Sequence, residues 1–518
     1  MKAELRVAFR TDASARIGIG HFMRCLTLAD ELRDKGVRTR FVCRNLPSEL
    51  QSRLASHNHE LRMLAPPSEI EQCDELSHAH FLEASQAQDA AATQVAIADA
   101  YWDWLIVDHY ALDHRFERLQ RKSTANIMVI DDIADRSHDC DLLLDQNLYP
   151  NMRKRYVGKL PDHCRILLGP EYALLRKEFR ELRDQVTPRN GQVARVLVFL
   201  GGFDPCNLTA TTIEALSKIA DRELHVDVVI GSGHPNRQEI EKLCEAHHYD
   251  CHVQTMRIAE LMATADLAIG AAGSASWERC CLGVPTIAFA FADNQRAVAE
   301  TLSQEGACIY LCDQSEASPQ NLSKLMQTLL AEPKRLVMIS SQAYKLVDGQ
   351  GCRRVLDTLM ENCNRSLQAR SVTENDEMLL LEWANDVDTR RNAFAPGLIP
   401  IATHKKWLQK RLQDPSCCRL YIIESSHGQA LGQVRFERGE GFWEVHYSVA
   451  PQFRARGLGR SLLGAGLQKF NGEGNCDALV RGQVKMANIP SQCIFESLGF
   501  ESRWNPDQEI IVYERSLC

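Results

Sequence analysis

Short apolar runs alternate with helical patterns along the first 180 residues of the chain. The runs are Val7 to Phe9, Phe41 to Cys43, Leu105 to Val107, Ile127 to Ile130 and Leu142 to Leu144. Strands that are covered by helices on both faces have this continuous apolar pattern, as in the parallel sheets of α/β proteins. Residues 1–180 are therefore predicted to form a Rossmann-like α/β domain.

A second series of apolar runs follows the polar stretch from Gln185 to Gln192. Its members are Val196 to Leu200, Val226 to Ile230, Leu267 to Ile269 and Thr286 to Phe289. Because the same alternation of strands and helices returns, a second Rossmann-like domain is predicted over residues 190–360.

The pattern changes after the polar residues Glu361 to Asp376, where we expect a linker. A helical segment with Trp383 comes next, followed by strands in which apolar and polar residues alternate, such as Trp443 to Val449. Alternation with a period of two is typical of a sheet that packs one face on a core. Residues 372–518 are long enough to form a third domain, predicted to be α+β.

Length and composition agree with this division. A chain of 518 residues exceeds the size of a single hydrophobic core. The formal net charge of -8 gives no reason to expect a nucleic-acid partner. No apolar run approaches the roughly 18 residues of a membrane span, and the first residues lack the layout of a signal peptide. We therefore expect a cytoplasmic protein without a membrane partner.

Cysteines and histidines do not form a recognisable metal motif. The 19 cysteines are scattered or adjacent, without a C-x-x-C unit, so reduced thiols are expected. Four histidines lie close in the sequence, at His57, His59, His78 and His80. Because no motif of carboxylates or thiolates accompanies them, a surface region is predicted there and no metal is expected.

A glycine turn that ends in a histidine is the first candidate for chemistry. The strand Val7 to Phe9 leads to Asp12, and then Gly18 and Gly20 precede His21, where a helical pattern begins. Asp12, Gly18 and Gly20 are the residues of this loop that are predicted to bind the substrate. Glycines let a backbone approach a ligand closely, and the dipole at a helix start favours the neutral imidazole that a general base requires. The alternative is that the glycines only make a tight turn and that His21 caps the helix.

Two glycine turns follow strands of the second series. Gly201 and Gly202 come after the strand that begins at Val196, while Gly273 and Ser274 come after Leu267 to Ile269. Turns without bulky side chains, at the carboxyl ends of parallel strands, form the crevice in which phosphates bind. The two turns therefore predict a site for the diphosphate of a nucleotide sugar.

Three polar side chains near these turns are candidates for the rest of that ligand. Glu278 falls in the opening turns of the helix after Gly273, where it is placed to accept hydrogen bonds from ribose hydroxyls. Asn294 and Gln295 follow the strand from Thr286 and are within reach of the sugar or a phosphate. The alternatives are a solvated helix carboxylate for Glu278 and an ordinary turn residue for Asn294.

A basic, glycine-containing loop marks the last domain. It follows the strand ending at Val449, precedes a helical pattern from Ser461, and contains Arg454, Arg456, Gly457, Leu458, Gly459 and Arg460. Backbone N–H groups, a helix start and the charges of Arg456 and Arg460 would surround an anion, so a pyrophosphate is the expected guest. The alternative is a basic turn without a ligand.

Four motifs resemble the UDP-sugar hydrolase family of pseudaminic acid biosynthesis, which is related in fold to the glycosyltransferase that makes the lipid-linked peptidoglycan precursor. The motifs are FRTDASARIGIGHFMR, VDHY, LGGFDP and GAAGSASWERCCLGVP. The resemblance covers approximately residues 5 to 360. It implies a glycosyltransferase-B-like pair of domains, with UDP held mainly by the second and the sugar in the cleft.

The same resemblance implies roles for individual residues. His21 corresponds to the family's catalytic histidine, which would deprotonate a water that attacks the anomeric carbon, with inversion and departure of UDP. Asp108 and Tyr110 belong to the VDHY motif and are expected in the substrate site. Met256 and Ile258 fall where the related transferase binds uracil. No metal is required, because helix N-termini can neutralise the diphosphate.

The loop from Arg454 to Gly459 reads R-x-x-G-x-G and resembles the acetyl-CoA loop of GNAT N-acetyltransferases. That resemblance spans about residues 372 to 515 and implies acetyl-CoA as co-substrate. Val449, Asn488 and the loop itself would bind it.

The last domain departs from its family at one position. Many GNAT enzymes have a tyrosine general acid where this chain has Phe495, so the proton must come from elsewhere. Glu444 and His446 share one face of a strand, and either is a candidate to activate the amine, with Glu444 as the first choice.

Together the resemblances imply consecutive steps on one UDP-linked amino sugar. The GNAT domain would acetylate the 4-amino group of a UDP-2-acetamido-4-amino-2,4,6-trideoxy sugar. The first two domains would then hydrolyse UDP-2,4-diacetamido-2,4,6-trideoxy-β-L-altropyranose. Two alternatives stay open: a glycosyltransferase with an acceptor other than water, and a hydrolase whose last domain binds acyl-CoA without catalysis. The sugar's stereochemistry, the acyl group and the oligomeric state are not fixed by the sequence.

Overall fold

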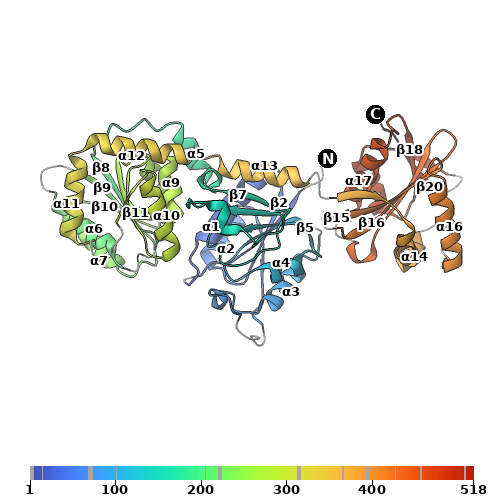
Figure 1. Cartoon of the computed structure of the whole chain (residues 1–518), viewed down its shortest axis with the longest axis horizontal. Coiled ribbons are helices and arrows are strands. Elements are labelled where there is room, and N and C mark those ends of the chain that lie inside the picture. Colours follow the sequence, from blue (N-terminus) through green and yellow to red (C-terminus); the bar gives the residue numbers. More distant parts are fainter. Residues whose placement is uncertain are drawn as a thin grey trace.

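The computed structural model consists of three domains (Figure 1). It describes residues 5–14, 16–67, 74–100, 102–202, 204, 206–219, 224–311, 317–363, 367–392, 397–425, 428–454, 458–506 and 509–517. For residues 293, 294, 362, 363 and 392 it describes the backbone alone.

The first domain is a parallel sheet in the order β3-β2-β1-β4-β5-β6-β7, with apolar clusters and helices on both faces. Its strands are β1 (Arg6–Thr11), β2 (Arg38–Cys43), β3 (Glu60–Met63), β4 (Trp102–Asp108), β5 (Thr124–Ile130), β6 (Leu142–Asp145) and β7 (Arg165–Leu168). Its helices are α1 (Gly20–Arg33), α2 (Ser48–Ser56), α3 (Gln86–Ala96) and α4 (His114–Gln120). The predicted Rossmann-like fold is confirmed, and the two strands that the apolar runs did not predict, β3 and β7, are the sheet's edges.

The second domain is a parallel sheet in the order β10-β9-β8-β11-β12-β13. Its strands are β8 (Arg195–Phe199), β9 (His225–Ile230), β10 (Asp250–Val253), β11 (Leu267–Ala271), β12 (Thr286–Phe289) and β13 (Ile309–Tyr310). Its helices are α5 (Lys177–Arg183), α6 (Leu208–Ser217), α7 (Arg237–His247), α8 (Ile258–Thr264), α9 (Ala275–Cys281), α10 (Asp293–Gln304), α11 (Pro319–Leu330) and α12 (Pro333–Leu346). The second Rossmann-like domain is confirmed as well.

Helix α13 (Gly351–Cys363) returns to the first domain (Figure 1). Its residues Cys352, Val355 and Leu359 are buried in the same apolar cluster as α1 and β1. The indole Nε1 of Trp104, on β4, donates to the carbonyl oxygen of Leu359 at 3.1 Å. The range 190–360 predicted for the second domain therefore includes a helix that packs on the first.

The two Rossmann-like domains share a buried interface. Tyr149, which follows β6 of the first sheet, belongs to the same apolar cluster as Trp277 of α9. Trp277 also donates from Nε1 to the side-chain oxygen of Asn147, just after β6, at 3.1 Å. The carboxyl end of β6 in the first sheet therefore lies beside the start of α9 in the second.

The third domain is a mixed sheet in the order β14-β15-β16-β17-β18-β20-β19. Its strands are β14 (Leu367–Ser371), β15 (Cys418–Ser425), β16 (Ala430–Arg438), β17 (Trp443–Val449), β18 (Leu479–Lys485), β19 (Glu501–Asn505) and β20 (Ile510–Ser516). Its helices are α14 (Glu377–Asn385), α15 (Val387–Asn392), α16 (Ile401–Gln413), α17 (Gly459–Gly472) and α18 (Ile489–Ser497).

The expected linker over residues 361–376 is wrong, because this stretch holds the end of α13 and the whole of β14. β14 pairs with β15 from Leu367 to Ser371, so the third domain begins before residue 372. The strand reads as polar because it is an edge strand whose residues are only partly buried.

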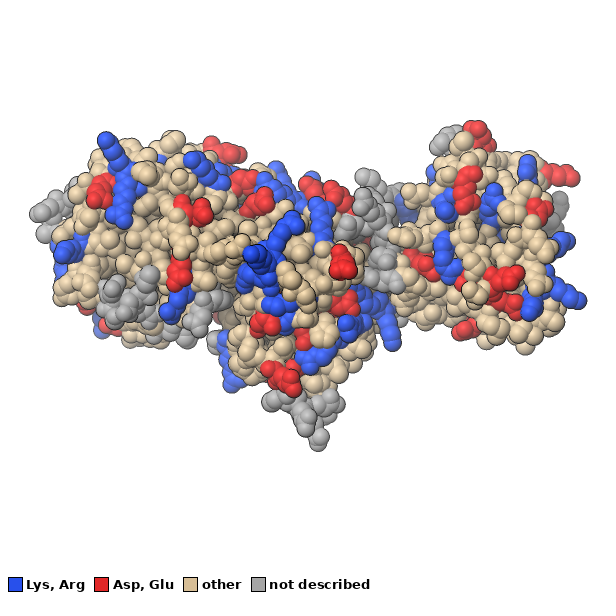
Figure 2. Space-filling view, in the orientation of Figure 1, with Lys and Arg blue, Asp and Glu red and all other residues tan. Residues whose placement is uncertain are grey.

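Surface charge and helix length complete the description. On the face shown in Figure 2, basic and acidic side chains are interspersed over all three domains. Among the described helices, none combines the length and apolar character that crossing a membrane requires.

Candidate functional site

The glycine turn between β1 and α1 places His21 at the second position of α1. Gly18 has φ +80°, in the left-handed region that favours glycine, and its N–H donates to the carbonyl of Ser14 at 2.8 Å. A Cβ at Gly18 or at Gly20 would meet no protein atom within 4 Å. The loop therefore leaves open space beside its backbone at the carboxyl end of β1, where ligands bind in open α/β sheets.

A carboxylate holds the ring of His21. Nδ1 of His21 lies 2.5 Å from Oδ1 of Asp108, the last residue of β4, and His21 is 8% exposed. The ring of Tyr110 meets the imidazole edge-on, with centroids 4.4 Å apart. An ionised carboxylate can only accept hydrogen bonds, so this contact places a hydrogen on Nδ1. In the neutral form of the imidazole the lone pair then lies on Nε2.

Arg24 keeps Asp108 ionised. One turn after His21 on α1, Arg24 donates to both oxygens of Asp108, at 2.6 and 2.7 Å. Burial alone would raise the pKa of Asp108, but Arg24 and His21 outweigh it and hold that pKa well below its usual range. The acceptor of the His21 proton is thus a carboxylate at any pH at which the protein works.

Asp132 and Tyr110 extend this network. Arg24 also donates to Asp132 at 2.8 Å, and the hydroxyl of Tyr110 donates to the other oxygen of Asp132 at 2.6 Å. Burial and the neighbouring Asp132 raise the pKa of Tyr110, so its hydroxyl stays protonated. The sequence indicated Tyr110 and Asp108. Arg24 ends the motif FRTDASARIGIGHFMR but was assigned no role, and Asp132, 108 residues further along the chain, was not indicated.

Asp12 has a different environment from the one that a substrate ligand needs. It is fully buried, and one oxygen accepts from the backbone N–H groups of Arg44 at 2.6 Å and Asn45 at 3.1 Å. The same carboxylate is 2.9 Å from the guanidinium of Arg10. Asp12 thus joins the carboxyl ends of β1 and β2.

The histidine cluster is not a simple surface region, and that expectation is corrected. The side chain of His59 is buried, and its Nε2 lies 3.0 Å from Asp30, as does Nδ1 of His57 at 2.9 Å. Arg33 donates to the same oxygen of Asp30 at 2.9 Å, so the carboxylate already has a cationic partner. His78 lies elsewhere, with its ring 5.3 Å from that of Tyr110.

The turn after β8 comes close to the turn after β9. Gly201 has φ +94°, and a Cβ there would meet nothing within 4 Å. A Cβ on Gly231 would lie 2.4 Å from the carbonyl oxygen of Gly202. Glycine at 231 therefore sets the position of the Gly201–Gly202 turn.

The turn after β11 is also open. A Cβ on Gly273 would meet only the side-chain nitrogen of Gln295, at 3.7 Å, so the structure brings these two predicted residues together. Ser274 is the residue before α9 and makes no side-chain capping bond. Burial raises the pKa of Glu278, which lies 3.7 Å from the guanidinium of Arg176. The side chain of Asn294 lies outside the described residues.

Met256 and Ile258, the two residues predicted to contact uracil, differ in exposure. Met256 lies in the loop after β10 and is 66% exposed, while Ile258, the first residue of α8, is buried. Side-chain contact with a ligand is therefore available to Met256, and Ile258 can offer its backbone.

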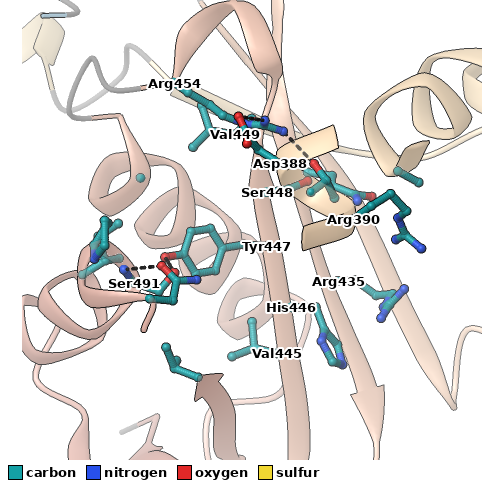
Figure 3. Close-up of a pocket in the computed structure, with 18 of the residues that line it drawn as sticks. Asp388, Arg390, Arg435, Val445, His446, Tyr447, Ser448, Val449, Arg454 and Ser491 are labelled. Carbon is teal, nitrogen blue, oxygen red and sulfur yellow. Dashed lines mark hydrogen bonds and ion pairs between the residues drawn. The ribbon is translucent and has the colours of Figure 1, made fainter. Parts of the chain in front are cut away.

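The third domain contains a cavity of about 890 Å³ where β17 and β18 separate. Within the described residues, the two strands pair only at Trp443 with Val480 and at Glu444 with Arg481. All residues from 445 to 449 line the cavity, so it reaches both faces of β17 (Figure 3).

The described residues of the predicted acetyl-CoA loop line this cavity. Gly459 is the first residue of α17, and Gly459, Arg460 and Val449 line the cavity together with Leu458. Arg456 and Gly457 fall outside the described residues. The start of a long helix beside an open cavity fits a pyrophosphate group.

Arg454 and Asn488 have partners within the protein. Arg454 pairs with Asp386 and donates to Thr389 at 2.6 Å. It also donates to the carbonyl oxygen of Val449 at 3.2 Å (Figure 3). Asn488 caps α18 by accepting from the N–H of Ser491 at 3.3 Å. Both residues line the cavity, and their side chains are hydrogen-bonded to neighbouring protein groups.

Glu444 and His446 share one face of β17, as alternation predicted, yet only His446 lines the cavity. Glu444 sits at the closed end, paired with Arg481 across the sheet. Burial and the nearby Glu437 raise the pKa of Glu444. Burial and Arg435 lower the pKa of His446 to about 4, so its imidazole is neutral at pH 7. Of these two residues, His446 is therefore the one that a ligand in the cavity can contact.

Comparisons with known proteins match each of two domains of this chain to a family. Residues 366–501 match the acetyltransferase (GNAT) domain model, and residues 195–350 match the glycosyltransferase family 28 C-terminal domain model. The chain is 25% identical over 303 residues to the UDP-2,4-diacetamido-2,4,6-trideoxy-beta-L-altropyranose hydrolase of Campylobacter jejuni, which covers 58% of this chain and 97% of that protein. The resemblance to the UDP-sugar hydrolase and GNAT families is confirmed.

Two further relatives extend the comparison. An uncharacterized protein of Methanocaldococcus jannaschii is 22% identical over 530 residues, covering 99% of this chain and 100% of the relative. Among solved structures, MurG of Acinetobacter baumannii is 16% identical, with a TM-score of 0.49 over 69% of this chain and 99% of that one.

Proposed function

We propose that the first two domains hydrolyse UDP-2,4-diacetamido-2,4,6-trideoxy-β-L-altropyranose, and that the third domain N-acetylates the 4-amino group of its precursor with acetyl-CoA. The observation that carries the hydrolase is the pairing of His21 with an ionised Asp108, which leaves Nε2 as a proton acceptor beside an open glycine loop. The two carboxyl-terminal sheet edges adjoin at Asn147 and Trp277, which supports a ligand held between the domains.

In the proposed hydrolysis, Nε2 of His21 accepts a proton from water as the water oxygen bonds to the anomeric carbon. The bond from that carbon to the diphosphate oxygen breaks, UDP leaves with the electron pair, and the configuration inverts. Asp108 orients the imidazole and stabilises the imidazolium that forms. Backbone N–H groups of the turns at Gly201 and Gly273 stabilise the diphosphate charge, so protein groups perform each step without a metal.

In the proposed acetylation, His446 takes a proton from the amine, directly or through one water, as the nitrogen bonds to the acetyl carbon. Its neutral imidazole lines the cavity, which the carboxylate of Glu444 does not. We therefore propose His446, and not Glu444, as the base that activates the amine.

A glycosyltransferase is the competing function for the first two domains, because residues 195–350 match a glycosyltransferase family 28 model. The same diphosphate cradle would serve either reaction. Release of UDP and free sugar without added acceptor supports hydrolysis, while turnover that depends on an acceptor supports transfer.

The decisive experiment incubates the purified protein with acetyl-CoA and the UDP-4-amino sugar and identifies the products by mass and NMR. His21→Ala is expected to keep CoA release and to slow UDP release by about 10²- to 10⁴-fold. His446→Ala is the matched opposite: it slows CoA release and leaves hydrolysis of the diacetamido substrate unchanged. Loss of both activities in both variants, or of neither, would contradict this division of labour. No CoA release by the unaltered protein would favour a third domain that only binds acyl-CoA.

A further inference from the structure

Acetyl transfer needs a group that returns a proton to the leaving sulfur, and Phe495 cannot supply one. Phe495 is 2% exposed, with its ring stacked on Tyr513 at 5.1 Å and edge-on to Phe500 at 5.0 Å. A Cβ on Gly482 of β18 would lie 2.4 Å from Cζ of Phe495, so the ring packs directly on the backbone of β18 at this glycine. This residue is part of the domain's core.

A tyrosine from a different element points into the same space. Tyr447 lies on β17, its ring is 5.9 Å from that of Phe495, and its hydroxyl is 2.9 Å from the hydroxyl of Ser491 (Figure 3). Both Tyr447 and Ser491 line the cavity. Ser491 is held in turn by Asn488, which accepts from its backbone N–H.

The geometry separates this hydroxyl pair from the proposed base. Successive residues of a strand point to opposite faces, and Figure 3 shows Tyr447 directed towards Ser491 while His446 lies on the side of Arg435. The cavity joins the two sides only because β17 and β18 have parted beyond Glu444. A thioester carbonyl in that gap would have a proton acceptor on one side and a proton donor on the other.

We propose that Tyr447 is the proton donor to the leaving thiolate in this domain and that Ser491 positions its hydroxyl. The inference rests on the proposed acetyltransferase activity. As the amine nitrogen bonds to the acetyl carbon and loses its proton to His446, the carbon–sulfur bond breaks and the sulfur takes the proton of the Tyr447 hydroxyl. The phenolate is then reprotonated from solvent through the Ser491 hydroxyl, and His446 releases to solvent the one proton that it took from the amine.

The protonation state of Tyr447 suits a donor. Burial raises the pKa of Tyr447 to about 12, so the hydroxyl keeps its proton between pH 6 and pH 9. Burial in the cavity also raises the pKa of the CoA thiol that forms there. The pKa of that thiol is therefore closer to the pKa of Tyr447 than it would be in water.

The test measures CoA release and acetyl-CoA binding on the full-length protein. Tyr447→Phe is expected to lower kcat for CoA release by about 10- to 100-fold, while the Kd for acetyl-CoA, measured by calorimetry, changes less than about three-fold. Ser491→Ala is expected to lower kcat by about three- to ten-fold. The matched control is Tyr421→Phe, because the Tyr421 hydroxyl bonds Glu473 at 2.7 Å and does not line the cavity. UDP release from the diacetamido substrate stays unchanged in all three variants.

The outcomes separate this assignment from the function on which it rests. CoA release that stays within two-fold in Tyr447→Phe, or that falls only in proportion to acetyl-CoA binding, overturns the role of Tyr447. A protein that never releases CoA overturns the acetyltransferase and this assignment together. If Tyr447→Phe does not fold, Ser491→Ala decides: an unchanged kcat overturns the proposal, and a lowered kcat with intact binding supports it.

Discussion

At the scale of single residues, the proposed hydrolysis depends on which nitrogen of His21 carries a proton. Asp108 fixes that choice because it is kept as a carboxylate by Arg24, whose guanidinium lies between Asp108 and Asp132. The imidazole is therefore oriented by a chain of charges of alternating sign, all of it buried. Such a network has one satisfied arrangement and holds the base without a cost of reorganisation.

Asp108→Asn tests this orientation. The amide can donate to Nδ1, which moves the proton to Nε2 and removes the base, so kcat for UDP release is expected to fall by about 10³-fold. The Kd for UDP is expected to stay within about two-fold, because the proposed diphosphate contacts lie in the other domain. The control is Asp30→Asn. Asp30 lies on the same helix as His21, and its carboxylate contacts His57 and His59. This substitution is expected to leave kcat for UDP release unchanged. A normal rate in Asp108→Asn would mean that His21 works without its carboxylate.

At the scale of elements, one turn of the proposed diphosphate cradle packs against the glycine turn after β9. The turns after β8 and β9 pass so closely that Gly231 has no room for a side chain against Gly202. Because the blocking atoms are backbone, the turn and not a flexible side chain would have to move. The position of the Gly201–Gly202 N–H groups is therefore coupled to a residue that need not touch the ligand.

Gly231→Ala is expected to weaken UDP binding by about 10-fold, which corresponds to about 1.4 kcal/mol. The added Cβ would displace the Gly202 carbonyl, which lies 2.4 Å away, and with it the turn. Gly233→Ala is the matched control, since a Cβ two residues further on meets nothing within 4 Å. Calorimetric titration with UDP checks both variants; equal affinities would show that the turn is not part of the cradle.

At the scale of the whole molecule, the apolar runs predicted each central strand of the two parallel sheets and missed every edge. β3, β7, β10 and β13 lie at sheet edges, where partial exposure weakens the apolar pattern. The site followed the same logic. Local motifs indicated His21, but the chain cannot show locally that Arg24 meets Asp132, or that Tyr447 meets Ser491 44 residues later.

Helix α13 is the strongest case of a feature that only the assembled molecule reveals. Its apolar face can be predicted from the sequence, but amphipathicity alone does not show which sheet a helix packs on. The chain leaves the second domain and packs α13 against α1 and β1, so the first domain is completed by residues that follow the second. The helix thereby ties the domain that carries His21 to the one that carries the glycine cradle.

Leu359→Ala tests this dependence. Leu359 is fully buried against the first domain, so its truncation is expected to lower that domain's free energy of unfolding by about 2 to 5 kcal/mol. The second domain does not contain this side chain in its core, so UDP affinity at low temperature stays unchanged. Met360→Ala is the control on the same helix, because Met360 is 39% exposed and its loss costs little. Scanning calorimetry with and without UDP separates the two domains. Leu359→Ala should lower the unfolding temperature of the first domain, and UDP should raise only that of the second. If that substitution instead moved the UDP-dependent transition, α13 would belong energetically to the second domain, and the first would have to be stable without it.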